Sequence, residues 1–342
     1  MGFLKDKTLG FFVKTGGIFS QYLFGGIGLV FMLHRVLPNK LKKRYTINED
    51  LAITPEFLEQ TIVSLKQRDF RFISLDELHL IIQTGKKPNK KCICITLDDG
   101  YRDNVIYGLP IFKKHEVPFT IYVSNCLPNK KAHFWWYWLE EKLHIEEKLI
   151  WKGISYSTKT EAEKNTVFNL IRESIKNASQ TKRLEYAQEF FGKTDLEIEL
   201  ESTKLGLSWE ELNELKNEPL ATIGAHTMHH LSLAYQTNED MIYEIKKSKI
   251  ELEDKLKIQI EHFAYPFGSI YDAKNREFEM TNKIGFKTAT LNHPGNTFLS
   301  NKKSLMSLAR YPLGNSTTEE KMDQYINGIS HFAENGWKKN IK

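Results

Sequence analysis

The sequence feature that most constrains the fold is a fully apolar strand that ends in two acidic residues. Residues 92–97 are apolar or β-branched throughout, which is typical of a strand buried on both faces in a parallel sheet. Asp98, Asp99 and Gly100 follow directly. Because α/β folds place their chemistry at the carboxyl ends of parallel strands, both carboxylates are candidate functional groups. A helix cap is the alternative, but a cap needs only one Asp. Neighbouring strand residues point to opposite faces, so the two carboxylates have different roles unless the chain bends at Gly100.

A second apolar strand ends in histidines. Residues 220–225 form a short buried strand, and His226 and His230 follow it. Their i, i+4 spacing places both rings on one side of a helical turn, which is a spacing typical of metal ligands. One carboxylate and two imidazoles leave open positions on a divalent ion, as a hydrolytic site requires. An isolated histidine pair is more often structural, so the prediction depends on the two strand ends together.

Strand and helix patterns alternate along most of the chain. Apolar strands are expected at 28–34, 70–73, 92–97, 118–124, 220–225, 260–264, 285–291 and 307–310, and amphipathic helices lie between them, for example 74–85 and 239–256. This alternation predicts an α/β fold with a parallel sheet or barrel over about 28–325.

The alternation stops between the fourth and fifth of these strands. Polar helical patterns fill about 127–218, so we expect a helical insertion outside the barrel that shapes the substrate site. It begins with an aromatic run over 133–139 that includes Trp135. Such rings either stack on sugars or pack in a core, and core packing is expected for most of them.

Composition excludes some classes of function. The net charge is only +5 and the lysines are scattered, so no nucleic-acid partner is expected. Three cysteines without loop spacing exclude a disulfide scaffold and suit a reducing compartment.

The two ends of the chain are expected to lie outside the barrel. Residues 1–27 are predicted to contain a helix and 326–342 a frayed tail. No signal-peptide cleavage site is evident near the apolar run 16–33, which predicts a cytoplasmic protein. Residues 3–24 fit two interpretations equally, a helix on the inner face of the membrane or a helix packed on the barrel.

Three motifs resemble the polysaccharide deacetylase family (carbohydrate esterase family four). Residues 96–101 (TLDDGY) look like its first motif, 226–230 (HTMHH) like its second, and 263–268 (FAYPFG) like its third. Residues 32–36 (MLHRV) are similar to a strand of the branch with rearranged motif order, which includes poly-N-acetylglucosamine deacetylases. The resemblance implies a distorted seven-stranded (β/α) barrel.

The resemblance also implies roles for individual residues. Asp99, His226 and His230 would hold a divalent metal, with zinc expected from this ligand set. Asp98 would be the general base and His34 the general acid, and the backbone N–H of Phe267 would stabilise the oxyanion.

The chain departs from the family where the third motif usually has an arginine, since Ala264 or Tyr265 takes its place. Arg310 is a candidate substitute, and a surface or phosphate-contacting role is the alternative. The two late family motifs are also missing. Tyr101, Tyr265 and Trp135 are expected to contact substrate.

The function implied is a metal-dependent hydrolase that removes an N-acetyl group from a surface polysaccharide or from its lipid-linked or cytoplasmic precursor. Two alternatives remain open: an O-acetyl esterase or other amide hydrolase on the same scaffold, and a catalytically silent carbohydrate-binding protein.

Overall fold

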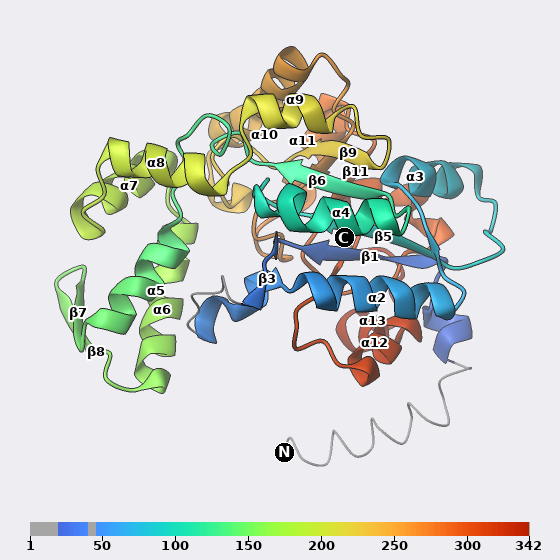
Figure 1. Cartoon of the computed structure of the whole chain (residues 1–342), viewed down its shortest axis with the longest axis horizontal. Helices are drawn as coiled ribbons and strands as arrows, with labels where there is room; N and C mark the ends of the chain where they lie inside the picture. The colour runs from blue at the N-terminus through green and yellow to red at the C-terminus, as the bar shows by residue number, and fades with distance from the viewer. Residues whose placement is uncertain (1–19, 40–45, 342) are drawn as a thin grey trace.

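The computed structural model describes residues 20–39 and 46–341 and contains one curled parallel sheet surrounded by helices (Figure 1). The strands follow the spatial order β11 (Thr288–Thr290), β10 (His262–Ala264), β9 (Ala221–Ala225), β6 (Phe119–Val123), β5 (Cys92–Leu97), β1 (Gly28–Leu33) and β12 (Tyr311–Pro312). A short eighth strand, β4 (Arg71–Phe72), pairs with the start of β5. All of these pairings are parallel. The predicted seven-stranded α/β barrel is confirmed.

Residues 308–312 connect the two edges of the sheet. Leu308 forms a parallel bridge with Thr290 of β11, and Tyr311 of β12 pairs with Phe31 of β1. The last strand therefore begins slightly later than the predicted 307–310. Its path places Arg310 between the two edges, at the carboxyl end of the barrel.

Helices cover the outer face of the sheet because each has one apolar side. They are α2 (Pro55–Gln67), α3 (Leu75–Thr84), η3 (a π-helix, Asn104–Gly108), α4 (Leu109–Lys114), α10 (Asn238–Leu256), α11 (Asn275–Ile284) and α12 (Glu319–Ile326). Thr54 and Ser74 cap α2 and α3 through their side-chain oxygens. Two short strands outside the main sheet, β2 (Arg35–Val36) and β3 (Ala52–Ile53), pair with each other.

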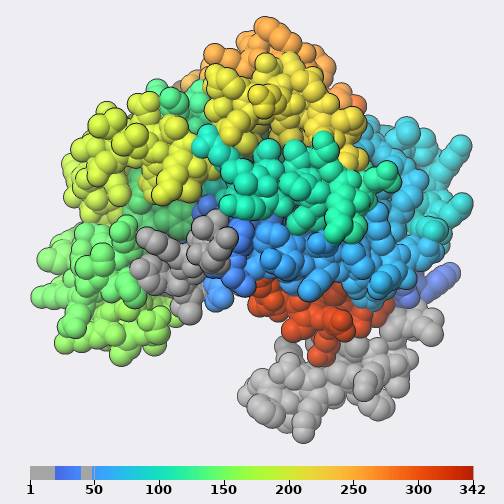
Figure 2. Space-filling model, viewed as in Figure 1, coloured from blue at the N-terminus to red at the C-terminus, as the bar shows by residue number. Residues whose placement is uncertain are grey.

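The insertion between β6 and β9 forms a lobe beside the barrel, drawn in green at the left of Figures 1 and 2. It contains α5 (Trp135–Ile145), β7 (Lys148–Trp151), β8 (Ile154–Ser157), α6 (Glu161–Lys176), α7 (Gln180–Glu185), η4 (Tyr186–Phe190) and α8 (Asp195–Leu205), and α9 (Trp209–Leu215) leads back to the sheet. It has an apolar cluster of its own, built around Trp138, Leu139 and Ile171. The β7–β8 hairpin corrects the expectation of a wholly helical insertion. Lys152 and Gly153 at its turn adopt positive φ.

The C-terminal end is more ordered than predicted. The predicted tail 326–342 contains a helix, α13 (Ile329–Asn335). Residues 20–24 are helical, and the ring of Phe24 contacts Phe332 and Trp337 at centroid distances of 4.8 and 5.1 Å. The rest of the predicted membrane-contacting segment 3–24 lies outside the described residues. Across 20–39 and 46–341, no helix combines the length and apolar character needed to cross a bilayer.

Candidate active site

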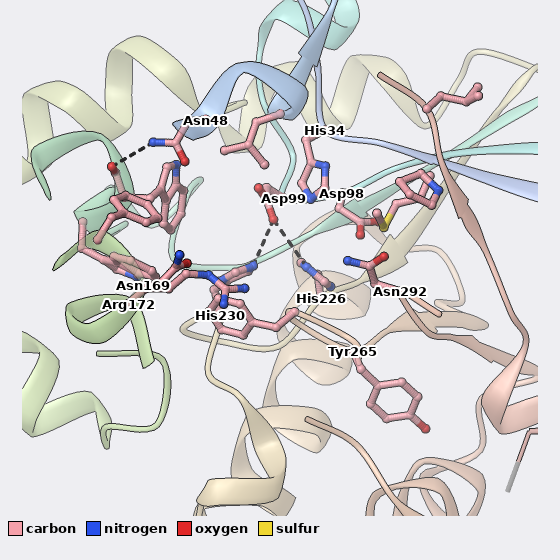
Figure 3. Close-up of a pocket in the computed structure, with 18 of the residues that line it drawn as sticks. His34, Asn48, Asp98, Asp99, Asn169, Arg172, His226, His230, Tyr265 and Asn292 are labelled. Atoms are coloured by element: carbon pink, nitrogen blue, oxygen red, sulfur yellow. Dashed lines mark hydrogen bonds and ion pairs between the residues drawn. The ribbon is translucent and has the colours of Figure 1, made fainter. Parts of the chain in front are cut away.

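The chain bends sharply where β5 ends. The Asp98 amide donates to the Leu33 carbonyl at 2.8 Å, and Asp99 and Gly100 then adopt φ values of +77° and +91°. Positive φ is uncommon outside glycine, so Asp99 has an unusual backbone conformation that the surrounding structure holds. Both carboxylates therefore face one cavity (Figure 3).

Asp99, His226 and His230 converge as predicted. The Asp99 Oδ1 atom lies 3.4 Å from His226 Nε2 and 3.2 Å from His230 Nε2, and the three ligand atoms lie within 4.8 Å of one another. The expected helical turn is wrong, however. Thr227 and His230 have φ values of +67° and +55°, and the Thr227 hydroxyl accepts the His230 N–H at 3.0 Å. The two rings converge through this irregular loop.

The three donor atoms fit a divalent cation. His226 Nδ1 lies 2.7 Å from the Ala264 carbonyl, which can only accept, so in the neutral ring Nε2 carries a lone pair directed at Asp99. Burial lowers the pKa of His230, which favours its neutral ring, although Asp99 opposes this. Asp99 Oδ1 is buried without a hydrogen-bond partner among the described residues. Lone pairs that converge on one point without a proton donor need a cation between them.

Asp98 is held by Arg310 and not by the histidines. The guanidinium donates to both carboxylate oxygens at 2.6 and 2.7 Å, and also to the carbonyl of Leu291 and the hydroxyl of Thr96. Burial raises the pKa of Asp98, but the charges of Arg310 and His226 and the hydrogen bonds from Arg310 together outweigh burial, and the net pKa is lowered. Arg310 is 0% exposed, so the alternative of a surface or phosphate contact is wrong.

His34 lines the cavity, and its ring points toward Asp98 and Asp99 in Figure 3. The backbone around it is held by residues that follow the acidic pair. Asn104 donates to the His34 carbonyl at 3.0 Å, and Asp103 accepts the Val36 N–H at 3.0 Å and pairs with Arg35 at 2.8 Å. Sequence analysis did not identify Asp103 or Asn104 as site residues, so their contact with the His34 loop is a finding of the structure.

Phe267 borders the cavity in a strained conformation, with φ of +61°. Its N–H donates to no other described residue, so it is free to donate to a ligand. Its ring contacts the His230 ring at a centroid distance of 5.0 Å.

The insertion contributes one residue that holds the backbone of His230 in place. Arg183 of α7 donates to the His230 carbonyl at 2.7 Å and to the carbonyls of Ile175 and Lys176. Burial lowers its pKa to about 10, so it remains cationic at neutral pH. A lone arginine in a polar helix gives no signal of this role in the sequence.

The cavity has a volume of about 550 Å³ and opens between the barrel mouth and the insertion. Trp135 lines it as predicted, together with polar residues that sequence analysis missed: Asn48, Asn165, Asn169, Arg172 and Asn292. Only Asn292, just beyond the end of β11, lies where strand-end reasoning could have found it.

Two of the predicted substrate contacts are enclosed by packed side chains. Tyr265 borders the cavity, but its ring packs against Phe263 and Phe278 and its hydroxyl donates to the Met306 carbonyl. It lies two residues after Phe263 and so shares the face that packs on the helices. Tyr101 is 1% exposed and belongs to the core of the insertion, with the Arg35 guanidinium 4.7 Å from its ring centre.

Comparison with known proteins finds a matching family and several similar folds. The sequence profile of the polysaccharide deacetylase family matches residues 85–289. YxkH of Bacillus subtilis strain 168, which is named for the same family, is 28% identical over 97 residues, equal to 28% of this chain and 35% of that protein. The Streptococcus pyogenes deacetylase PplD, solved with acetate, has a TM-score of 0.58 at 16% identity, covering 87% of this chain and 97% of that chain. IcaB from Ammonifex degensii has a TM-score of 0.54 at 16% identity, covering 87% and 96%. At these identities the structural likeness shows the fold.

Proposed function

Because the chain belongs to the polysaccharide deacetylase family, we propose that it is a metal-dependent hydrolase that removes an N-acetyl group from a sugar of a surface polysaccharide or of its precursor. One observation carries the proposal: Asp99, His226 and His230 converge beside a second carboxylate, Asp98, that a buried arginine keeps separate from them.

Hydrolysis of the amide requires activation of both the carbonyl group and the leaving nitrogen. The carbonyl is a poor electrophile and the sugar amine is a poor leaving group. A divalent cation bound by Asp99, His226 and His230, for which we propose zinc, would polarise the carbonyl and activate a water molecule. The remaining contributions come from the side chains and backbone around it.

Asp98 is suited to accept the proton of the attacking water. Its pKa is lowered, so it is ionised at neutral pH. The bidentate contact with Arg310 fixes the plane of the carboxylate, because a guanidinium fork matches both oxygens. We therefore assign Asp98 as the general base and Arg310 as the residue that positions it.

His34 and Phe267 act on the other side of the reacting carbonyl in this proposal. His34 faces the same cavity, and its ring makes no hydrogen bond to another described residue, so it can give a proton to the leaving nitrogen. The free N–H of Phe267 can donate to the carbonyl oxygen as negative charge develops there.

Acetate release from purified protein tests the proposal. Protein stripped with a chelator and reloaded with zinc should release acetate from an N-acetylated glucosamine oligosaccharide faster than from a matched O-acetylated one. His226→Gln should abolish release, whereas His115→Gln makes the same chemical change outside the cavity, where His115 contacts Glu59, and should not.

Three outcomes would overturn it. Faster release from the O-acetylated sugar would make the protein an esterase, and glycan binding without release would make it a binding protein. Full activity after metal removal would refute the assigned chemistry. Comparing a polymer with a lipid-linked oligosaccharide of the same sugar would show whether polymer or membrane-bound precursor is the substrate.

A further inference from the structure

One wall of the cavity comes from the insertion and takes no part in the proposed chemistry. Helix α6 contributes Asn165, Phe168, Asn169 and Arg172, which are spaced i, i+3, i+4 and i+7 and so lie on one side of the helix. Figure 3 shows Asn169 and Arg172 on the same side of the cavity as His230. These α6 residues form the insertion wall. It lines the same cavity as Asp99, His226 and His230, so a glycan bound in the cavity can contact both.

The insertion wall is rich in hydrogen-bond donors. The indole Nε1 atoms of Trp135 and Trp136 are buried and have no hydrogen-bond partner among the described residues, although both residues line the cavity. Indole and guanidinium groups can only donate. Both indole nitrogens are enclosed, so the guanidinium of Arg172 is the cationic donor of this wall that a ligand can reach.

The wall also carries an available positive charge. Arg172 pairs at 2.7 Å with Glu173 on its own helix, and both side chains are partly exposed, at 38% and 48%. Exposed pairs of this kind are weak and exchange readily. Arg310 and Arg183, which lie beside Asp98 and His230, are buried and already bonded, Arg310 to the Asp98 carboxylate and Arg183 to the His230 carbonyl.

The acidic groups of the cavity do not offset this charge. Among the described lining residues, Asp98 and Asp99 are the only acidic side chains. Asp98 is neutralised by Arg310, and Asp99 faces the two histidines.

We infer that the insertion wall binds an anionic substituent of the acetylated glycan, a carboxylate or a phosphate, through Arg172. The inference rests on the proposed deacetylase function and narrows its substrate to an acidic glycan. Asn165 and Asn169 can both donate and accept, so they suit the hydroxyl or acetamido groups of the same sugar.

Kinetics on three matched N-acetylated oligosaccharides test this inference: one neutral, one with a uronic acid beside the acetylated sugar, and one with a phosphate there. The wild-type enzyme should show about tenfold higher kcat/KM on an acidic substrate than on the neutral one, the size expected of one charge-assisted contact. The acidic substrate with the higher value identifies the anion as carboxylate or phosphate.

Variants at Arg172 assign the effect. Arg172→Gln should raise KM for the preferred acidic substrate by about tenfold, with kcat unchanged and the neutral substrate unaffected. Arg172→Lys should recover part of the loss, because it keeps the charge without the fork. Lys182→Gln is a matched control, since it removes one positive charge from α7, outside the cavity. Raising the salt concentration should lower the ratio of kcat/KM on the acidic substrate to that on the neutral one in wild type, but not in Arg172→Gln.

The outcomes separate this inference from the proposed function. Equal kcat/KM on all three substrates, or an unchanged acidic preference in Arg172→Gln, overturns the acidic subsite and leaves the deacetylase assignment intact. No acetate release from any substrate overturns the proposed function and the inference with it. Because Arg172 is partly exposed, its variants should remain folded, and equal melting temperatures would verify this.

Discussion

Replacing Arg310 with Gln should destabilise the barrel strongly, because it leaves the Asp98 carboxylate buried without its counter-charge. The guanidinium makes two bonds to Asp98 and one each to Leu291 and Thr96, and the arginine and aspartate side chains are 0% and 4% exposed. Removing one partner of a buried pair costs about 3–5 kcal/mol. A domain of this kind is stable by roughly 5–15 kcal/mol, so the loss is a large fraction of the total.

The assay is urea unfolding of wild type, Arg310→Gln, Asp98→Asn and the double variant, all in chelator. Chelation is needed because a metal bound only to the folded state would add its binding energy to the stability. The double variant should be less destabilised than the sum of the single variants, with a coupling energy of about 2–3 kcal/mol. Arg310→Lys should recover part of the loss, since an ammonium group keeps the charge but cannot make the bidentate contact.

Additivity within about 0.5 kcal/mol would refute this reasoning, because independent sites add to that accuracy. It would mean that the two side chains do not depend on each other energetically, despite their short contacts. The role of Arg310 in holding the base would then lose its physical basis.

Three further predictions concern zinc binding by Asp99, His226 and His230 and the stability of the fold. Asp99→Ala should abolish zinc binding and activity, whereas Asp98→Asn should bind zinc by calorimetry but release no acetate. Arg183→Met should weaken zinc binding by about 10–100-fold while the far-UV spectrum is kept, because the carbonyl of His230 loses its donor. Burial lowers the pKa of His331 to about 4, so its neutral ring stabilises the fold fully above about pH 6.5. That contribution to the free energy of unfolding should fall by up to roughly 3 kcal/mol as pH drops from 6.5 towards 4. The urea midpoint of His331→Gln should therefore change less with pH across this range than the midpoint of wild type.

Most of the barrel could be predicted because its strands are buried on both faces. Residues 92–97 and 220–225 read as continuous apolar segments, and polar residues directly after them mark the functional edge. That reasoning locates Asp98, Asp99, His226 and the region of His230 without any knowledge of how the strands are ordered.

Local geometry was harder to predict because the same residue spacing is compatible with several backbone conformations. The i, i+4 spacing of His226 and His230 fits a helix, yet the Thr227 side chain bonds to the backbone and produces a loop. Tyr265 follows a strand end as Asp98 does, but strand alternation directs its ring to the helices. The β7–β8 hairpin is only four residues a strand, too short for its alternation to stand out.

The arrangement of the site follows the order of strands around the barrel and not their order in the chain. Passing from β12 through β1, β5 and β9 to β10, the barrel mouth presents Arg310, His34, Asp98 with Asp99, the histidine pair and then Phe267. The proposed acid and base therefore come from neighbouring strands, although 63 residues lie between His34 and Asp98 in the sequence. Arg310 adjoins Asp98 because residues 308–312 return beside β1 to close the sheet. A distant segment can thus supply the arginine that the third motif lacks, provided that this segment reaches the same part of the barrel mouth. Chain order alone leaves the carboxylate of Asp98 without a counter-charge, whereas the spatial order of the strands places Arg310 beside it.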